Sequence, residues 1–168
     1  MNAMTQLAIK DGYLPGAIGR ITELHSAYYW KQWGFGLYFE SKVAVELSEF
    51  LSRFDKNRDG IWLATLNGRI EGSLIMDGIH AEDKGVHLRW FIVSGHMQGK
   101  GIGRLLISRA MDFYRIKQYH KIYLWSFEGL NAARHLYENA GFRLVRQQRG
   151  VQWGTEVNEQ YFEHVAME

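Results

Sequence analysis

The sequence from Val86 to Arg104 reads Val86-His-Leu-Arg-Trp-Phe-Ile-Val93-Ser-Gly-His-Met-Gln98-Gly-Lys-Gly-Ile-Gly103-Arg104. Residues 86–93 are apolar and β-rich, interrupted only by His87 and Arg89, which predicts a central strand. Three alternating glycines follow in residues 98–103, and apolar residues then recur at helical spacing up to residue 118. A strand, a glycine loop and a helix in this order leave main-chain N–H groups exposed at a helix N-terminus. That arrangement favours a phosphate cradle.

Two motifs in this chain are similar to those of a known superfamily. Gln98-Gly-Lys-Gly-Ile-Gly103 fits the Q/R-x-x-G-x-G pattern of the GCN5-related N-acetyltransferases (GNAT). Further along, Ala133-Arg-His-Leu-Tyr-Glu-Asn-Ala-Gly-Phe142 resembles the A-x-x-L-Y-x-x-x-G-F segment of the same superfamily. The order and separation of the motifs also match, and the resemblance covers nearly the whole chain, most weakly before residue 80.

A subgroup of that superfamily shows a closer likeness. Its pattern includes Leu88-Arg-Trp-Phe-Ile-Val93, Ala132-Ala-Arg-His-Leu-Tyr-Glu138, Leu124-Trp-Ser126, Trp153-Gly154 and Glu159-Gln160. It resembles acetyltransferase domains that occur alone and fused to MarR-like DNA-binding domains. Nothing in residues 1–168 suggests a separate winged helix, so the resemblance implies the stand-alone type.

Composition limits the class of protein. The 168 residues are 46% apolar and 23% charged, which is typical of one soluble globular domain spanning residues 1–168. A net charge of +2 is too small to suggest general binding to nucleic acid. Because there is no cysteine, disulfides, thiolate zinc sites and cysteine nucleophiles are excluded. No signal peptide or membrane span is evident, so a cytoplasmic location is expected.

The order of elements predicts an α/β (α+β) fold. A short strand at residues 7–9 precedes helices over residues 18–32 and 40–54, and Asn67-Gly68 joins two strands, 61–66 and 69–77, as a hairpin. The remaining elements are expected at 86–93, 101–118, 121–125, 131–140, 143–151 and 157–165, with Gly141 as a helix C-cap. The helical crossover makes strands 86–93 and 121–125 parallel within a mixed, mostly antiparallel sheet covered by helices on both faces. The GNAT resemblance further implies that this pair splays apart at one end.

The segment from Trp33 to Phe39 is unusually aromatic and has two interpretations. It could be a hydrophobic plug packed under the first two helices. It could equally be an adaptable wall over an acceptor pocket, which is where similar proteins place this connection.

The resemblance implies acetyl-CoA as co-substrate and no metal. The glycine loop would hold the pyrophosphate through backbone amides, with Lys100 and Arg104 adding positive charge. The backbone of residues 91–93 would bind the pantetheine arm. Candidate cofactor-binding residues are Phe91, Ile92, Val93, Gln98, Gly99, Lys100, Gly101, Ile102, Gly103, Arg104, Asn131 and Arg134.

Tyr137 matches the tyrosine that protonates the departing thiolate in this family. A phenol with a pKa of ~10 is a workable acid toward a thiolate whose conjugate acid has a pKa of ~8.5. An asparagine found seven residues earlier in many members is replaced by Leu130, and Asn131 could simply cap the helix. Arg134, one turn before Tyr137, could reach a phosphate or lie in solvent.

The general base is less defined. His87 takes the position at which histone-modifying members carry a glutamate, and an imidazole with a pKa of ~6.5 would suit that role. A packing role is the alternative. Glu71, Glu40 and ordered water are further candidates.

Substrate contacts are expected from Arg89, Tyr28, Trp125 and Trp153. Arg89 shares a sheet face with His87 and is costly inside an apolar strand unless it is paired. It could bind a substrate carboxylate or pair with an internal carboxylate such as Glu71. The aromatic residues are core residues by default.

The combined interpretation is an N-acetyltransferase that moves the acetyl group directly to a primary amine of a small molecule, amino acid or peptide. No nucleic-acid or membrane partner is expected, and a homodimer is left open. The alternative is a catalytically silent CoA-binding sensor. A Rossmann dinucleotide site is disfavoured because the glycines follow G-x-G-x-G and the loop comes mid-chain. The arginines at 143, 146 and 149 are typical of a solvated strand face.

Overall fold

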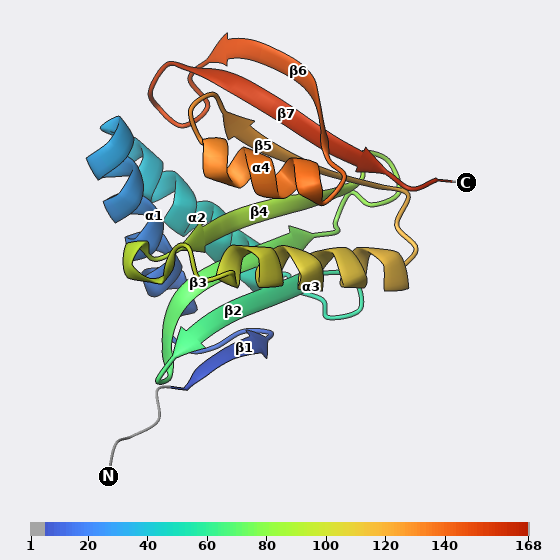
Figure 1. The fold of residues 1–168 in the computed structure, drawn as a ribbon, viewed down its shortest axis with the longest axis horizontal. Coiled ribbons are helices and arrows are strands. Elements are labelled where there is room, and N and C mark those ends of the chain that lie inside the picture. Colours follow the sequence, from blue (N-terminus) through green and yellow to red (C-terminus); the bar gives the residue numbers. More distant parts are fainter. Residues whose placement is uncertain (1–5, 168) are drawn as a thin grey trace.

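One seven-stranded sheet runs through the computed structural model, which describes residues 6–167 (Figure 1). The strand order is β1-β2-β3-β4-β5-β7-β6, and all neighbours are antiparallel except β4 and β5. The strands are β1 (Leu7–Asp11), β2 (Gly60–Leu66), β3 (Arg69–Asp77), β4 (Val86–Val93), β5 (Lys121–Phe127), β6 (Arg143–Gly150) and β7 (Val157–Val165). This confirms the mixed sheet with a central parallel pair.

Helices cover both faces of the sheet, as expected (Figure 1). α3 (Ile102–Ile116) and α4 (Asn131–Asn139) pack on one face, and α1 (Ala17–Trp33) and α2 (Leu37–Ser52) on the other. A short 3-10 helix (Gly95–Met97) links β4 to the glycine loop. Within residues 6–167, every helix is too short or too polar to cross a membrane.

Two turn predictions are confirmed by backbone angles. Asn67 and Gly68 both have positive φ, 50° and 81°, which lets a two-residue turn follow the twist of the hairpin strands β2 and β3. Gly141 has a φ of 96° directly after α4, as a left-handed C-cap requires.

The second helix differs from its prediction: it runs from Leu37 to Ser52 and not from Glu40 to Phe54. Gly34 caps α1 and Gly36 precedes α2, so the connection shrinks to three residues. Phe35 and Phe39 are buried between the two helices, as the hydrophobic-plug interpretation requires, and both also line a cavity, as the pocket-wall interpretation requires. The apolar first turn hid the true start of the helix.

A β-bulge interrupts β4 at Trp90, which has a φ of 48°. Ile75 of β3 pairs with Arg89 and Ser73 pairs with Ile92, so β4 carries one extra residue between these positions. Leu88 and Phe91 therefore pack on the α3 side, whereas Trp90 joins the core beneath α1 and α2. The Ser73 hydroxyl donates a 2.6 Å hydrogen bond to the Trp90 carbonyl and holds the bulge.

β4 and β5 pair over only two positions, Val86 with Ile122 and His87 with Tyr123. Beyond them the strands separate, so main-chain groups of β4 that face the gap have no strand partner. The resemblance implied this splay.

Replacing Ser73 by alanine tests the anchoring of the bulge. Ser73→Ala should lower the free energy of unfolding by about 1–3 kcal/mol, because the buried Trp90 carbonyl loses its donor. Chemical denaturation provides the measurement, and Ser108→Ala on the exposed surface of α3 is the matched control. Equal stabilities for the two variants would show that the hydroxyl does not hold the bulge.

Candidate active site

A cavity of about 360 Å³ lies where β4 and β5 separate. Residues 87–91 of β4 and 124–127 of β5 form its sides. Side chains from opposite faces of the sheet also line it, with α1 and α2 on one face and α4 on the other. The gap therefore connects the two faces of the sheet.

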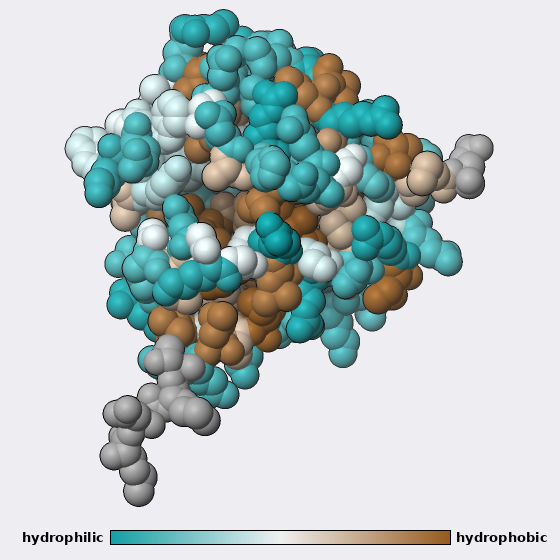
Figure 2. Space-filling view, viewed as in Figure 1, coloured by the Kyte–Doolittle hydropathy of each residue, from teal (hydrophilic) through white to brown (hydrophobic). Residues whose placement is uncertain are grey.

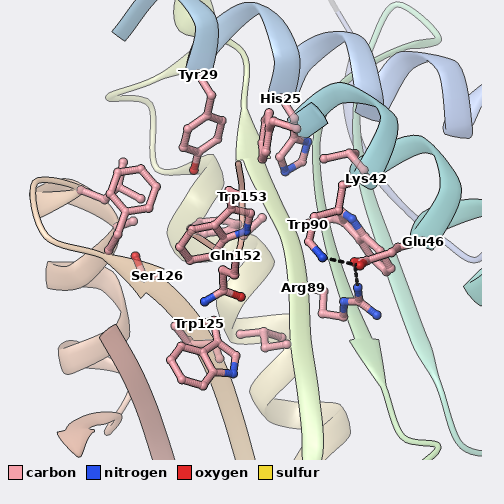
Figure 3. Close-up of a pocket in the computed structure, with 18 of the residues that line it drawn as sticks. His25, Tyr29, Lys42, Glu46, Arg89, Trp90, Trp125, Ser126, Gln152 and Trp153 are labelled. Atoms are coloured by element: carbon pink, nitrogen blue, oxygen red, sulfur yellow. Dashed lines mark hydrogen bonds and ion pairs between the residues drawn. The ribbon is translucent and has the colours of Figure 1, made fainter. Parts of the chain in front are cut away.

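Figure 3 shows how the elements meet in this cavity. His25 and Tyr29 reach in from α1, and Lys42 and Glu46 reach in from α2. Trp125 and Ser126 come from β5, while Gln152 and Trp153 come from the β6–β7 connection.

The glycine loop has the open geometry that an anion cradle needs. Gly99 and Gly101 have φ of 75° and 80°, and a Cβ on either would meet no atom of the described chain within 4 Å. Gly101 is the N-cap of α3 and offers no side chain to the first N–H groups of that helix. Because those donors lack an intrahelical acceptor, they suit phosphate oxygens.

The other loop residues divide into structural and exposed positions. Ile102 is core, and a Cβ at Gly103 would come within 3.2 Å of Leu136 and Phe91, so this glycine permits close packing. Gln98 donates its side-chain amide to the Val93 carbonyl at 3.1 Å. Lys100 and Arg104 are exposed and form no ion pair within residues 6–167. A hollowed, partly apolar band crosses this side of the molecule between α3 and α4 (Figure 2).

Tyr137 lines the cavity from α4 and is buried. Its ring packs near Phe91 of β4, at 5.9 Å between centroids. Burial raises the pKa of the Tyr137 phenol well above its ordinary value. The phenol therefore keeps its proton at neutral pH.

One expectation for α4 is wrong and another stays open. Asn131 is exposed in the first turn, but Leu130 is the N-cap and forms no side-chain capping bond, so Asn131 does not cap the helix. Arg134 pairs with Glu138, Nε to Oε1 at 2.8 Å, because the two are one helical turn apart.

The premise that His87 keeps an ordinary pKa is wrong. His87 lines the cavity and stacks on Tyr123 at 4.6 Å, and burial beside Arg89 lowers its pKa to about 3. Glu71 is buried on β3 against Arg20 at 3.0 Å, and Glu40 is exposed on α2. Neither carboxylate lines the cavity.

Arg89 is paired, but not with Glu71. Its guanidinium lies 2.5 Å from Glu46 and 3.6 Å from Asp77, and it stacks 4.0 Å from the ring of Trp90. The register explains the error, because Arg89 lies opposite Ile75 of β3 whereas Glu71 lies four residues away along that strand, near Arg20.

Of the predicted aromatic residues, Trp125 and Trp153 line the cavity. Tyr28 does not: the next residue, Tyr29, takes its place and Tyr28 packs edge-on against it at 4.9 Å. Tyr29 follows His25 by one helical turn on the side of α1 that lines the cavity, whereas Tyr28 lies beside that stripe.

Besides Tyr29 and several apolar residues, five polar or charged cavity residues were not anticipated as site residues: His25, Lys42, Glu46, Ser126 and Gln152. His25 sits in an otherwise apolar stripe, which was an available signal. Its Nδ1 contacts the Ile21 carbonyl at 2.8 Å, and burial lowers its pKa to about 4. Lys42 and Glu46 have the spacing of a surface ion pair, which concealed them. Within residues 6–167, no group of three or more His, Cys, Asp or Glu side chains could hold a metal ion.

Comparison with known proteins identifies relatives with stated activities. The N-acetylaspartate synthetase of Danio rerio is 28% identical over 119 residues, which cover 70% of this chain and 42% of that protein. The chain thus matches less than half the length of this relative. The spermidine N(1)-acetyltransferase of Vibrio cholerae is 46% identical over 52 residues, 30% of each chain.

Solved structures and a family model give the same assignment. A Salmonella typhimurium protein, solved with its cofactor acetyl-CoA, superimposes with a TM-score of 0.72 at 19% identity, covering 97% of this chain and 95% of that one. This likeness establishes the fold. The model of the acetyltransferase (GNAT) family matches residues 20–142. Because that match covers most of the chain, this protein belongs to the acetyltransferase (GNAT) family.

Proposed function

We propose that this protein transfers the acetyl group of acetyl-CoA directly to a primary amine bound between β4 and β5. The observation that carries the proposal is the cavity in the strand gap, which is lined from both faces of the sheet. One substrate can approach from the α3–α4 face and the other from the α1–α2 face, so the reacting atoms meet in the gap.

The residues present fit acetyl-CoA. Gly99, Gly101 and the N-terminus of α3 would bind the pyrophosphate, and Lys100 and Arg104 would add charge. The gap-facing backbone of residues 91–93 would hold the pantetheine arm and orient the thioester carbonyl. Contacts from Asn131 and Arg134 to the cofactor stay predictions, and Arg134 would have to leave its ion pair with Glu138 to make one.

Tyr137 is proposed as the general acid. When the amine attacks the thioester carbon, the C–S bond breaks and the sulfur needs a proton. Burial raises the pKa of Tyr137, but a thiol in the same apolar surroundings also has a raised pKa. The phenol therefore stays protonated until the thiolate forms, and then donates.

Ordered water is proposed to take the proton from the amine. His25 and His87 line the cavity, yet their pKa values of about 4 and 3 make both weak bases at pH 7. As neutral imidazoles they can accept hydrogen bonds and orient water or substrate. A neutral amine is the nucleophile in every variant of this mechanism.

The identity of the amine is less constrained than the reaction. The named relatives are an N-acetylaspartate synthetase and a spermidine N(1)-acetyltransferase, whose acceptors differ in charge. We also expect residues 1–168 to act as one domain, supported by the single sheet from β1 to β7. Membership of the subgroup also fused to MarR-like domains stays a prediction.

Replacing Tyr137 by phenylalanine tests the acid. Tyr137→Phe should lower kcat by about 10-fold or more while leaving acetyl-CoA affinity within about 2-fold, because only the proton donor is lost. Steady-state kinetics with an accepted amine and calorimetric titration with acetyl-CoA provide the two readouts. Tyr13→Phe, at an exposed tyrosine, is the control.

An unchanged kcat would remove Tyr137 from the chemistry. Acetyl-CoA binding without transfer to any primary amine would support the alternative, a CoA-binding sensor, which the leucine at position 130 favours. Failure to bind acetyl-CoA at all would overturn the proposed function.

The buried histidines also predict acid sensitivity. Because the folded protein holds the pKa of His25 near 4, the unfolded chain binds more protons below about pH 6.5. Stability present above pH 6.5 is lost as the pH falls toward 4, by up to about 3 kcal/mol for His25. His25→Gln should reduce the slope of the unfolding free energy against pH over the ~2 units between pH 4.5 and pH 6.5. The exposed His135→Gln serves as control, and an identical slope in both variants would contradict the assignment.

A further inference from the structure

A compact charge cluster forms one wall of the cavity. Glu46 accepts from Lys42 at 2.6 Å through Oε1 and from Arg89 at 2.5 Å through Oε2 (Figure 3). All three side chains line the cavity and each is less than one-third exposed. Two cations thus share one carboxylate at a surface that a substrate can reach.

The next layer of charge does not balance this cluster. Asp77 lies 3.6 Å from Arg89, but Arg53 binds both oxygens of Asp77, at 2.9 Å and 2.6 Å. Counting all five groups gives three cations (Lys42, Arg53, Arg89) and two carboxylates (Glu46, Asp77). The cluster therefore carries one excess positive charge.

Arg89 is the most buried of the three cations. Its side chain is only 19% exposed. Burial lowers the pKa of Arg89 even though Glu46 and Asp77 both act to raise it. A buried cation whose carboxylate partners only partly offset its desolvation gains from one more anion.

Much of the rest of the wall is aromatic. Aromatic rings from α1, the α1–α2 connection, α2, β5 and the β6–β7 connection face the same space: Tyr29, Phe35, Phe39, Phe127 and Trp153. Among residues 6–167, Glu46 is the one carboxylate that lines the cavity, and it is already shared by two cations. A polyamine would find no free carboxylate there for its distal ammonium groups.

Resting on the acetyl transfer proposed above, we propose that the acceptor is an amino acid with an apolar side chain, whose carboxylate binds Lys42 and Arg89. Glu46 holds both cations in place when the site is free and competes with the incoming carboxylate. The aromatic wall receives the apolar side chain. Recognition thus uses a group that the acetyl transfer leaves unchanged.

A matched pair of amines isolates the carboxylate. L-Phenylalanine and phenethylamine share the ring and the primary amine and differ only in that group. Calorimetric titration of the protein saturated with CoA should give L-phenylalanine an affinity at least about 10-fold higher than that of phenethylamine or spermidine. Equal or tighter binding of phenethylamine or spermidine would overturn the inference.

Three substitutions assign the effect to the cluster. Arg89→Gln and Lys42→Gln should each weaken L-phenylalanine binding about 10- to 100-fold and leave phenethylamine within about 3-fold. Glu46→Gln should tighten L-phenylalanine binding, because the competing carboxylate is gone; a merely structural role would not give this sign. Arg109→Gln on α3 removes the same charge at an exposed position and should change neither affinity. Weaker binding in Glu46→Gln would contradict the inference.

Activity distinguishes the two proposals. Acetylation of L-phenylalanine with a KM that rises in Arg89→Gln at similar kcat supports both. Acetylation of amines without a carboxylate, at equal or higher kcat/KM, overturns the acceptor class and leaves the transferase standing. Absence of acetyl-CoA binding by the wild-type protein overturns the proposed function itself.

Discussion

The rest of the structure depends on the loss of pairing between β4 and β5 after His87 and Tyr123. Two central strands that part inside a sheet leave polar main-chain groups without partners, and such groups are costly unless something binds them. The bulge at Trp90 accompanies this break, and Ser73 holds the bulged carbonyl from β3. The gap is therefore a feature that the fold itself maintains, and a bound substrate can supply hydrogen-bond partners to the unpaired main-chain groups.

The bulge also sets the chemistry of the two sides of the gap. It turns Trp90 to the α1–α2 face, where Arg89 stacks on its ring and reaches Glu46, and it turns Phe91 to the α4 face beside Tyr137. An unbroken strand would alternate strictly and would send Trp90 to the face of Leu88. Because of this one extra residue, β4 presents the charged Arg89–Glu46 contact on one face of the sheet and the aromatic Phe91–Tyr137 contact on the other.

The sequence predicted what depends on local rules. Two of the alternating glycines, Gly99 and Gly101, the Asn67-Gly68 turn and the cap at Gly141 all have the positive φ that few other residues adopt. Errors arose where tertiary contacts decide. The phase of the α1 stripe selected Tyr29 over Tyr28, and the apolar first turn of α2 looked like a loop. The partner of Arg89 could not be predicted, because Glu46 reaches it from α2, 43 residues away in the sequence.

The site combines two electrostatic demands that oppose each other. Attack on a thioester needs a neutral amine. Burial favours the neutral forms of the groups around the reaction, so at pH 7 Tyr137 is an un-ionised phenol and both cavity histidines are neutral imidazoles. Recognition of a small polar substrate is instead strongest through charge. The fold answers both by confining permanent charge to the Lys42–Glu46–Arg89 cluster, where paired ions stabilise one another. Since the excess there is positive, selection by charge can act on a carboxylate without holding the reacting amine as an ammonium.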